Sequence, residues 1–260
     1  MNQHEEFARQ CEEEIRGLGE DRDLAGLSRI WIREISPHKW AYHFTWLGRP
    51  AIQFPNDAWA FQEIVWRTRP DLIIETGVAH GGSLILSASM LALLDVSDAI
   101  QSRSMLDPSV SSRKVVGIDI DIRPHNREAI EAHPMSSRIQ MIEGSSVALD
   151  VVQQVRSIAA GYRTVMVCLD SNHTHEHVLG ELEAYAPLVT PGSFCIVYDT
   201  IVEDLPKALF PDRPWGPGNN PKTAVWEFLR SHPEFEIDKG IADKLQITVA
   251  PDGFLRKKCS

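Results

Sequence analysis

Residues 69–90 read R-P-D-L-I-I-E-T-G-V-A-H-G-G-S-L-I-L-S-A-S-M, and this stretch decides the fold. It begins with a short apolar run at 72–74, passes through glycines at 77, 81 and 82, and continues in a longer apolar run. This order is typical of a buried strand, a tight turn and a helix. It predicts the first unit of a parallel α/β sheet, with the turn at the carboxyl edge, where such sheets bind nucleotide-like ligands.

The glycine spacing indicates which ligand the turn binds. A dinucleotide turn has the pattern G-x-G-x-x-G, but this chain has alanine at position 79, where a middle glycine is needed. Glu75 precedes Gly77 by two residues and would repel a diphosphate, whereas it suits an ammonium group such as the methionine end of S-adenosylmethionine. Gly81 closes the turn, and Gly82-Ser83 is the expected helix start, where the ligand's carboxylate would be favoured. The alternative is a turn that serves only strand-to-helix packing.

Composition limits the class of protein. The chain has 260 residues and is 43% hydrophobic, which is enough for one large α/β domain with an extension. Lysine and arginine total 26 against 36 acidic residues, a net charge of −10, and no basic run exceeds residues 256–258. We therefore expect no nucleic-acid partner. The polar start and the lack of a long apolar run predict no membrane segment and a cytoplasmic protein. The four cysteines lack C-x-x-C spacing, which argues against structural zinc.

Strands and helices alternate through five units after residue 57. Four further strands are expected at 114–120, 138–143, 164–169 and 193–198, and residues 235–238 and 244–256 are expected to form two closing strands. The predicted fold class is α/β, a Rossmann-like, doubly wound, mostly parallel seven-stranded sheet that ends in an antiparallel hairpin. We expect Asn56 or Asp57 to cap the helix before the first strand, and a serine-rich surface loop at 95–113.

Residues 1–56 are expected to form an N-terminal arm on a catalytic domain of residues 57–260. Five large aromatic residues crowd between positions 31 and 46 without clean periodicity. Such a surface must be covered, either by a second copy in a homo-oligomer or by the protein's own core. Near the other end, residues 206–221 are rich in proline and glycine and predict a long loop, a lid or wall beside the substrate.

Polar residues follow the second and third expected strands. Asp119 ends the second strand, where doubly wound sheets bind the ribose hydroxyls of nucleosides. The alternative is a polar residue that merely ends a strand. Ser145 and Ser146 follow the third strand at the same edge and are expected adenine contacts.

Two aspartates follow the fourth and fifth expected strands. If these strands are neighbours, the carboxylates of Asp170 and Asp199 come close and repel one another unless a cation separates them. A hard cation such as Mg²⁺, held by oxygen ligands, resolves this repulsion. The alternative is that each aspartate caps a neighbouring helix.

Histidines follow the first of these aspartates in the pattern H-x-H-x-H. His173 is the best placed as a general base, because histidine exchanges protons near neutral pH and this position still lies in the loop. His175 and His177 are expected to be helix N-terminal or surface residues. His80, inside the glycine turn, is a contact candidate without an assigned role.

Several long motifs occur together in this chain. They are I-E-T-G-V-A-H-G-G-S-L, G-I-D-I-D-I-R-P-H-N, L-D-S-N-H-T-H-E-H-V and W-G-P-G-N-N-P, and Y-H-F-T-W-L-G-R-P precedes them. From about Trp46 to its end, the chain resembles the cephalosporin hydroxylase-like or rhamnosyl O-methyltransferase family of class I S-adenosylmethionine-dependent methyltransferases. The resemblance implies S-adenosylmethionine bound by a Rossmann-like sheet, Mg²⁺ in related sugar O-methyltransferases, and oligomers built partly by N-terminal elements.

The resemblance also implies a ligand set for the metal. An aspartate after the fourth strand matches Asp170, and an acidic pair is expected after the fifth strand. Here that pair reads Tyr198-Asp199, so one carboxylate is absent. Thr200, Asn172 or water would then complete the shell.

The function expected from these residues is O-methylation of a sugar hydroxyl, rhamnosyl-like, in a small molecule or glycoside. One rival is a non-haem oxygenase, which needs two histidines and one carboxylate on one face. A second rival is a non-catalytic partner that binds S-adenosylmethionine and supports a hydroxylase. A dehydrogenase is disfavoured by the absent dinucleotide fingerprint.

Overall fold

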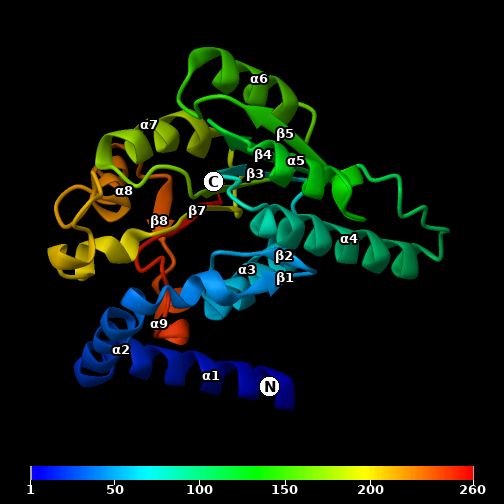
Figure 1. The fold of residues 1–260 in the computed structure, drawn as a ribbon. Coiled ribbons are helices and arrows are strands. Elements are labelled where there is room, and N and C mark those ends of the chain that lie inside the picture. Colours follow the sequence, from blue (N-terminus) through cyan, green and yellow to red (C-terminus); the bar gives the residue numbers. More distant parts are fainter. Residues whose placement is uncertain (1, 260) are drawn as a thin grey trace.

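The computed structural model describes residues 2–259 (Figure 1). The chain begins with two helices, two short 3₁₀ turns and a small hairpin, followed by the helix that leads into the main sheet. These elements are α1 (Gln3–Glu20), α2 (Arg22–Ile35), η1 (Ser36–His38), η2 (Trp40–His43), β1 (Thr45–Trp46), β2 (Arg49–Pro50) and α3 (Pro55–Thr68).

Seven strands form the central sheet in the order β5-β4-β3-β6-β7-β9-β8. The first five are parallel, while β9 is antiparallel to both β7 and β8. This confirms the predicted fold class. The strands are β3 (Leu72–Thr76), β4 (Lys114–Asp119), β5 (Ile139–Glu143), β6 (Val165–Leu169), β7 (Phe194–Val197), β8 (Phe235–Ile237) and β9 (Phe254–Lys257).

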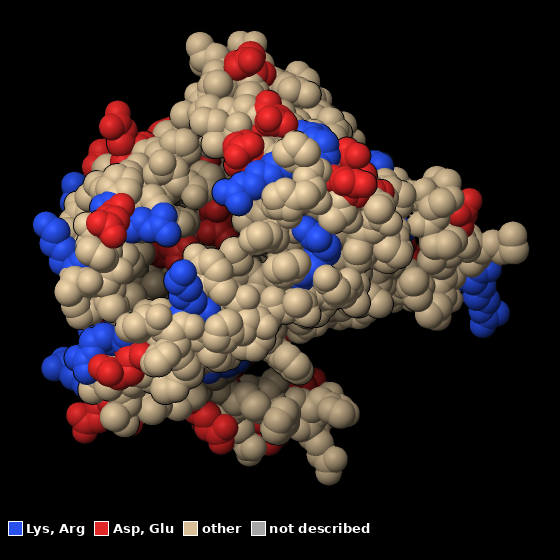
Figure 2. Space-filling view, viewed as in Figure 1, with Lys and Arg blue, Asp and Glu red and all other residues tan. Residues whose placement is uncertain are grey.

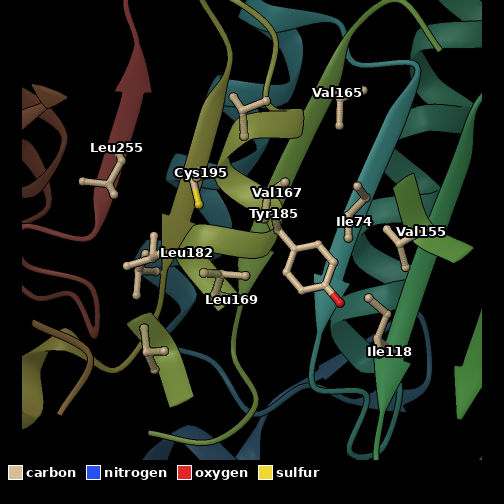
Figure 3. Packing of buried hydrophobic residues seen from close by; sticks show 14 of the residues in the cluster. Ile74, Ile118, Val155, Val165, Val167, Leu169, Leu182, Tyr185, Cys195 and Leu255 are labelled. Carbon is tan, nitrogen blue, oxygen red and sulfur yellow. The ribbon is translucent and has the colours of Figure 1, made fainter. Parts of the chain in front are cut away.

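Helices cover both faces of this sheet. On one face, α6, α7 and α8 pack against alternate strand residues, and Figure 3 shows Tyr185 among Ile74, Ile118 and Val155 of this layer. On the other face, α3, α4 and α5 pack against the intervening residues. The helices are α4 (Gly82–Ser102), α5 (Pro124–Glu131), α6 (Leu149–Ala159), α7 (His175–Tyr185), α8 (Pro221–Ser231) and α9 (Lys239–Leu245), with short 3₁₀ turns at η3 (Ser136–Arg138), η4 (Ala186–Leu188), η5 (Thr200–Asp204) and η6 (Lys207–Leu209).

Helix α4 runs further than expected. The predicted loop from 95 to 113 is wrong in its first part, because α4 continues to Ser102. Asp95 anchors this extension, since its carboxylate accepts hydrogen bonds from Arg113 and from the buried Arg138. By length and composition α4 is the described helix that could cross a membrane, but half of that window is buried against the sheet in this fold.

Two local predictions are corrected. Neither Asn56 nor Asp57 caps α3, which begins at Pro55. The carboxylate of Asp57 is buried and accepts hydrogen bonds from the Thr248 hydroxyl and the Val249 amide instead. The second closing strand is also shorter than predicted, because α9 takes up residues 239–245 and β9 begins only at Phe254. Residues between them serve other partners: the Val249 amide donates to Asp57, and the Gly253 carbonyl accepts from the Val197 amide of β7.

The aromatic residues near the N-terminus dock on the catalytic domain. Trp40 contacts Trp31, Phe44 and Phe54 in edge-to-face pairs with centroids 4.9–5.1 Å apart. Phe54 in turn belongs to a cluster with Ile32, Ile201 and Leu205. Trp40 and Phe54 are thus covered within the chain, whereas Tyr42 stays exposed, so cover by a second copy stays a prediction.

Candidate active site

The glycine turn lies against the neighbouring strand and the arm. Gly77 has φ +90°, and a Cβ there would overlap the carbonyl oxygen of Asp170. Gly81 precedes α4 with φ +81°, and a Cβ on Gly82 would overlap the Pro50 carbonyl. Only glycine fits at 77, where φ is left-handed and a Cβ would meet backbone, and at 82, where a Cβ would meet backbone directly. The turn therefore lies next to the end of β6, where the expected metal ligand follows.

Glu75 is buried at the end of β3, on the face that α4 covers. Ser87 of α4 donates to its carboxylate at 3.4 Å. Burial raises the pKa of Glu75 to about 7, although hydrogen bonds from Ser83 and Ser87 oppose the shift. An ammonium group nearby would favour the ionised form of this carboxyl.

Asp119 holds the inner side of the turn. Its Oδ2 accepts hydrogen bonds from the amides of Val78 at 2.8 Å and Ala79 at 3.3 Å, and its Oδ1 accepts one from the amide of Asp121 at 3.2 Å. The structure thus gives Asp119 a role in shaping the turn, which the sequence did not predict. Its contact with a ribose stays a prediction.

Two side chains that sequence reasoning missed hold the outer side of the turn. Arg49 of β2 donates to the carbonyl of His80 at 2.6 and 3.0 Å and to the side-chain oxygen of Asn126 at 3.1 Å. Asn126 donates to the carbonyl of Ala79 at 2.9 Å. Both residues lie in motifs quoted from the sequence, G-R-P and R-P-H-N. Those motifs could have identified Arg49 and Asn126 as site residues. His80 contributes its carbonyl, and its ring is partly exposed.

The serines after β5 differ from one another. Ser145 is partly exposed at the sheet edge, as an adenine contact requires. Ser146 is buried, and its hydroxyl donates to Glu181 Oε1 of α7 at 2.5 Å. The two serines therefore face different surroundings, and the adenine contact assigned to each stays a prediction.

Asp170, His173 and Asp199 come together after β6 and β7. One possible ligand atom from each lies within 4.8 Å of the other two. His173 Nε2 is 3.3 Å from Asp199 Oδ2. Burial, followed by the charges of Asp199 and Glu75, raises the pKa of Asp170 well above its usual range. Figure 2 shows acidic side chains on the floor of a recess, near the place where Figure 1 labels β7.

Tyr198, which stands in place of the family carboxylate, and the two side chains expected to complete the metal shell all have other surroundings. Tyr198 packs in the core, and burial raises the pKa of its phenol, so it cannot replace the missing carboxylate as an anion. The side-chain oxygen of Asn172 accepts from the amide and hydroxyl of Thr174. The Thr200 hydroxyl donates to the carbonyl of Pro251 at 2.6 Å. Both side chains are thus held by partners within the chain, and the make-up of the metal shell stays a prediction.

The other two histidines of the run lie outside this cluster. His175 Nδ1 is 2.8 Å from the hydroxyl of Thr223, and its Nε2 is 3.2 Å from a carboxylate oxygen of Glu227. His177 Nε2 is 3.0 Å from the Ser146 hydroxyl, in the group of side chains around Glu181. His175 thus occupies the helix N-terminal position that the sequence predicted.

The predicted loop at 206–221 forms one wall beside His173. The ring of Trp215 meets the imidazole edge to face, with centroids 4.8 Å apart. Glu203 Oε2 fixes the loop by accepting from the Gly218 amide at 2.7 Å and from the Asn220 side chain. Sequence reasoning identified the loop but not Trp215, because no local pattern indicates which side chain of a loop turns inward.

Comparisons with known proteins identify the family of this chain. The sequence model of the family described as Rhamnosyl O-methyltransferase/CmcI matches residues 38–258. A rhamnosyl O-methyltransferase of Mycobacterium leprae (strain TN) is 29% identical over 232 residues, which cover 85% of this chain and 89% of that protein. One from Mycobacterium bovis is 27% identical over 229 residues, covering 84% and 82%.

Solved structures of CmcI share the fold. One labelled Mg-SAM has a TM-score of 0.54 at 18% identity, with 84% of this chain and 78% of that chain covered. Another, labelled SAH, has a TM-score of 0.52 at 17% identity, with 83% of each chain covered. Since the family model matches most of the sequence, the chain belongs to the Rhamnosyl O-methyltransferase/CmcI family of S-adenosylmethionine-dependent methyltransferases.

Proposed function

We propose that this protein transfers a methyl group from S-adenosylmethionine to a hydroxyl of a rhamnosyl-like sugar, assisted by Mg²⁺. One observation carries the proposal: the glycine turn touches the backbone of Asp170, which lies within 4.8 Å of both His173 and Asp199. A turn suited to the donor and a cluster suited to a metal and a proton acceptor therefore share one edge of the sheet.

The donor half of the site comprises Glu75, residues 77–83, Asp119 and Ser145-Ser146. Glu75 would face the donor's ammonium group, and Ser83 with the start of α4 would receive its carboxylate. Asp119 would bind the ribose, the serines the adenine, and His80 would contact the bound donor. In support, Asp119 already shapes the turn through two amides.

The metal half comprises Asp170, His173 and Asp199. Two carboxylates and few other free ligands fit Mg²⁺, which is commonly held by one or two carboxylates and keeps several waters. The raised pKa of Asp170 supports this fit, because a cation would relieve the repulsion that Asp199 adds to the cost of burial. When bound, Mg²⁺ would supply Lewis acidity to a substrate hydroxyl.

His173 takes the proton of the acceptor hydroxyl. As the hydroxyl oxygen forms its bond to the methyl carbon, the bond from that carbon to sulfur breaks and the proton passes to the imidazole. Asp199 Oδ2, 3.3 Å from Nε2, stabilises the ring once it carries this proton. Trp215 excludes water on one side of the ring.

The oxygenase rival is less well supported. A non-haem iron site uses two histidines and one carboxylate, whereas the described cluster holds one histidine and two carboxylates. The non-catalytic rival differs from the proposal in requiring no proton acceptor, so His173 discriminates between them.

The test is methyl transfer from isotope-labelled S-adenosylmethionine to a panel of rhamnosides in the presence of Mg²⁺. We expect labelled product with the wild-type chain, a loss of at least about 100-fold for His173→Ala, and wild-type rates for the control His175→Ala, whose ring faces Thr223. If the wild-type chain fails to bind S-adenosylmethionine in calorimetry, the proposal is wrong.

The remaining expectations concern the assembly. We propose that residues 1–56 form an arm that covers the site and contributes to a homo-oligomer. We also propose that the protein acts in the cytoplasm on a small-molecule or glycoside substrate, without a nucleic-acid or membrane partner. Exposed apolar side chains on the arm, such as Leu27, Ile30 and Leu47, support an interface. Light scattering on the full chain would test it, and a strictly monomeric chain would contradict it.

A further inference from the structure

Glu181 is a buried carboxylate that the proposed chemistry does not use. It lies on α7 and is 0% exposed. Its Oε1 accepts hydrogen bonds from Ser146 at 2.5 Å and Ser171 at 2.6 Å, whereas its Oε2 is buried without a hydrogen-bond partner among residues 2–259. A half-paired buried carboxylate lowers stability, so packing alone does not account for it.

The two serines belong to different halves of the site. Ser146 follows β5 and is the neighbour of Ser145, on the donor side, while Ser171 directly follows Asp170, on the metal side. The strands that lead to them are not adjacent, because β4 and β3 lie between β5 and β6. The single oxygen of Glu181 therefore joins two loops that the sheet itself keeps apart.

Neighbouring groups hold this arrangement. His177 Nε2 lies 3.0 Å from the Ser146 hydroxyl, 3.2 Å from the Ser171 hydroxyl and 3.4 Å from Glu181 Oε1. The hydroxyl of Tyr185 donates to the Ser146 carbonyl at 2.5 Å and points toward the ends of the strands in Figure 3. Both loops are thus fixed from α7, through side chains on three of its turns.

We infer that Glu181 is a positioning residue that couples donor binding to metal binding by holding the loops after β5 and β6 in one arrangement. The inference rests on the proposed function and deepens it. Binding of the donor orders the loop at Ser145-Ser146, and through the shared oxygen this favours the position of Asp170 that binds the cation. By linkage, the cation must strengthen donor binding by the same factor.

The experiment is calorimetry on the full chain with S-adenosylhomocysteine, with and without MgCl₂. For wild type we expect Mg²⁺ to tighten the binding of S-adenosylhomocysteine by about 5-fold or more. In Glu181→Ala we expect donor binding to weaken by about 10-fold and this Mg²⁺ effect to disappear. Glu181→Gln keeps an oxygen that can accept from both serines, so it should restore the coupling.

The chain offers a matched control on the same helix. Glu183 is two residues further along and half exposed, near His232. Glu183→Ala should behave as wild type. Unchanged coupling in Glu181→Ala, or the same loss in Glu183→Ala, would overturn the inference, as would a lowered melting temperature with unaltered binding.

A second set of variants covers the case in which Glu181→Ala fails to fold. Ser146→Ala, Ser171→Ala and the double variant form a cycle, and a shared acceptor predicts effects on donor binding that depart from additivity by about 3-fold or more. Additive effects would contradict the inference. If the wild-type chain itself does not bind S-adenosylhomocysteine, the proposed function fails, which is a different outcome from bound ligand without coupling.

Discussion

The donor half and the metal half differ in how their polar groups are satisfied. In the donor half, the turn's amides at Val78 and Ala79 bind Asp119, and its carbonyls at Ala79 and His80 bind Asn126 and Arg49. In the metal half, one possible ligand atom each from Asp170, His173 and Asp199 lies within 4.8 Å of the other two. The turn of the donor half thus has partners within the chain, whereas the metal half carries negative charge that a ligand must balance.

This difference separates two uses of polar residues. A turn whose backbone is held by several side chains is preorganised, so the turn itself needs little ordering when the donor binds. Carboxylates that lie close together repel one another until a cation binds. Relief of this repulsion then adds to the free energy of cation binding. Changes in the metal half should therefore affect catalysis more than stability, and changes in the donor half should affect both.

The largest expected effect comes from removing one carboxylate of the metal half. Asp170→Asn should lower methyl transfer by at least about 100-fold, because it removes a proposed metal ligand. Magnesium should raise the melting temperature of wild type but not of this variant. The metal-free variant should melt no lower than wild type, since the lost charge is one that burial and Asp199 disfavour. Differential scanning calorimetry with and without Mg²⁺ checks this, and a large stability loss would contradict it.

The next largest effect is expected from a substitution that disturbs the backbone of the donor half. Gly77→Ala should destabilise the fold by about 2 kcal/mol or more and abolish donor binding, because its Cβ overlaps the Asp170 carbonyl at φ +90°. Gly48→Ala is the control, since Gly48 has a similar φ of +86° but no atom within 4 Å of its Cβ. It should cost about 1 kcal/mol of conformational strain alone. Equal losses in urea unfolding would show that the contact with Asp170 contributes nothing.

A smaller effect is expected where the arm meets the turn. Arg49→Ala should weaken S-adenosylhomocysteine binding by about 10-fold, because it releases the His80 carbonyl and one partner of Asn126. Arg33→Ala, an exposed arginine of α2, should leave binding unchanged. Calorimetric titration measures both variants. Identical affinities would show that the turn holds its shape without the arm.

The last effect concerns the pH dependence of stability, which does not involve either half of the site directly. Burial raises the pKa of Asp57 from 3.8 to about 7, so the folded state binds a proton more tightly than the unfolded state does. This contribution to stability is fully present below the unfolded pKa and is lost as the pH rises toward 7, with a slope of up to about 1.4 kcal/mol per pH unit. Asp57→Asn should remove that slope. Urea unfolding across this pH range tests it, and an unchanged slope would be contrary evidence.

Much of the fold could be read from the sequence. Residues 72–76 and the four following strands are short, apolar and bounded by turns, and these local patterns indicate buried parallel strands. The loop predicted at 95–113 failed because the residues that keep α4 helical there, Arg113 and Arg138, come later in the chain. The expected long closing strand failed for a similar reason, since residues 248 and 249 serve the distant Asp57.

For the site, the sequence by itself determined which chemical groups follow each strand: Glu75 and the glycines, Asp119, Asp170 with His173, and Asp199. It could do so because a parallel sheet gathers the ends of its strands at one edge. Only the tertiary structure decided how these groups are used, because their partners come from other elements. Asp119 binds turn amides, Trp215 meets His173 from a loop about 40 residues away, and Glu181 links two loops across the sheet. Such contacts depend on how the elements pack, which local spacing does not encode.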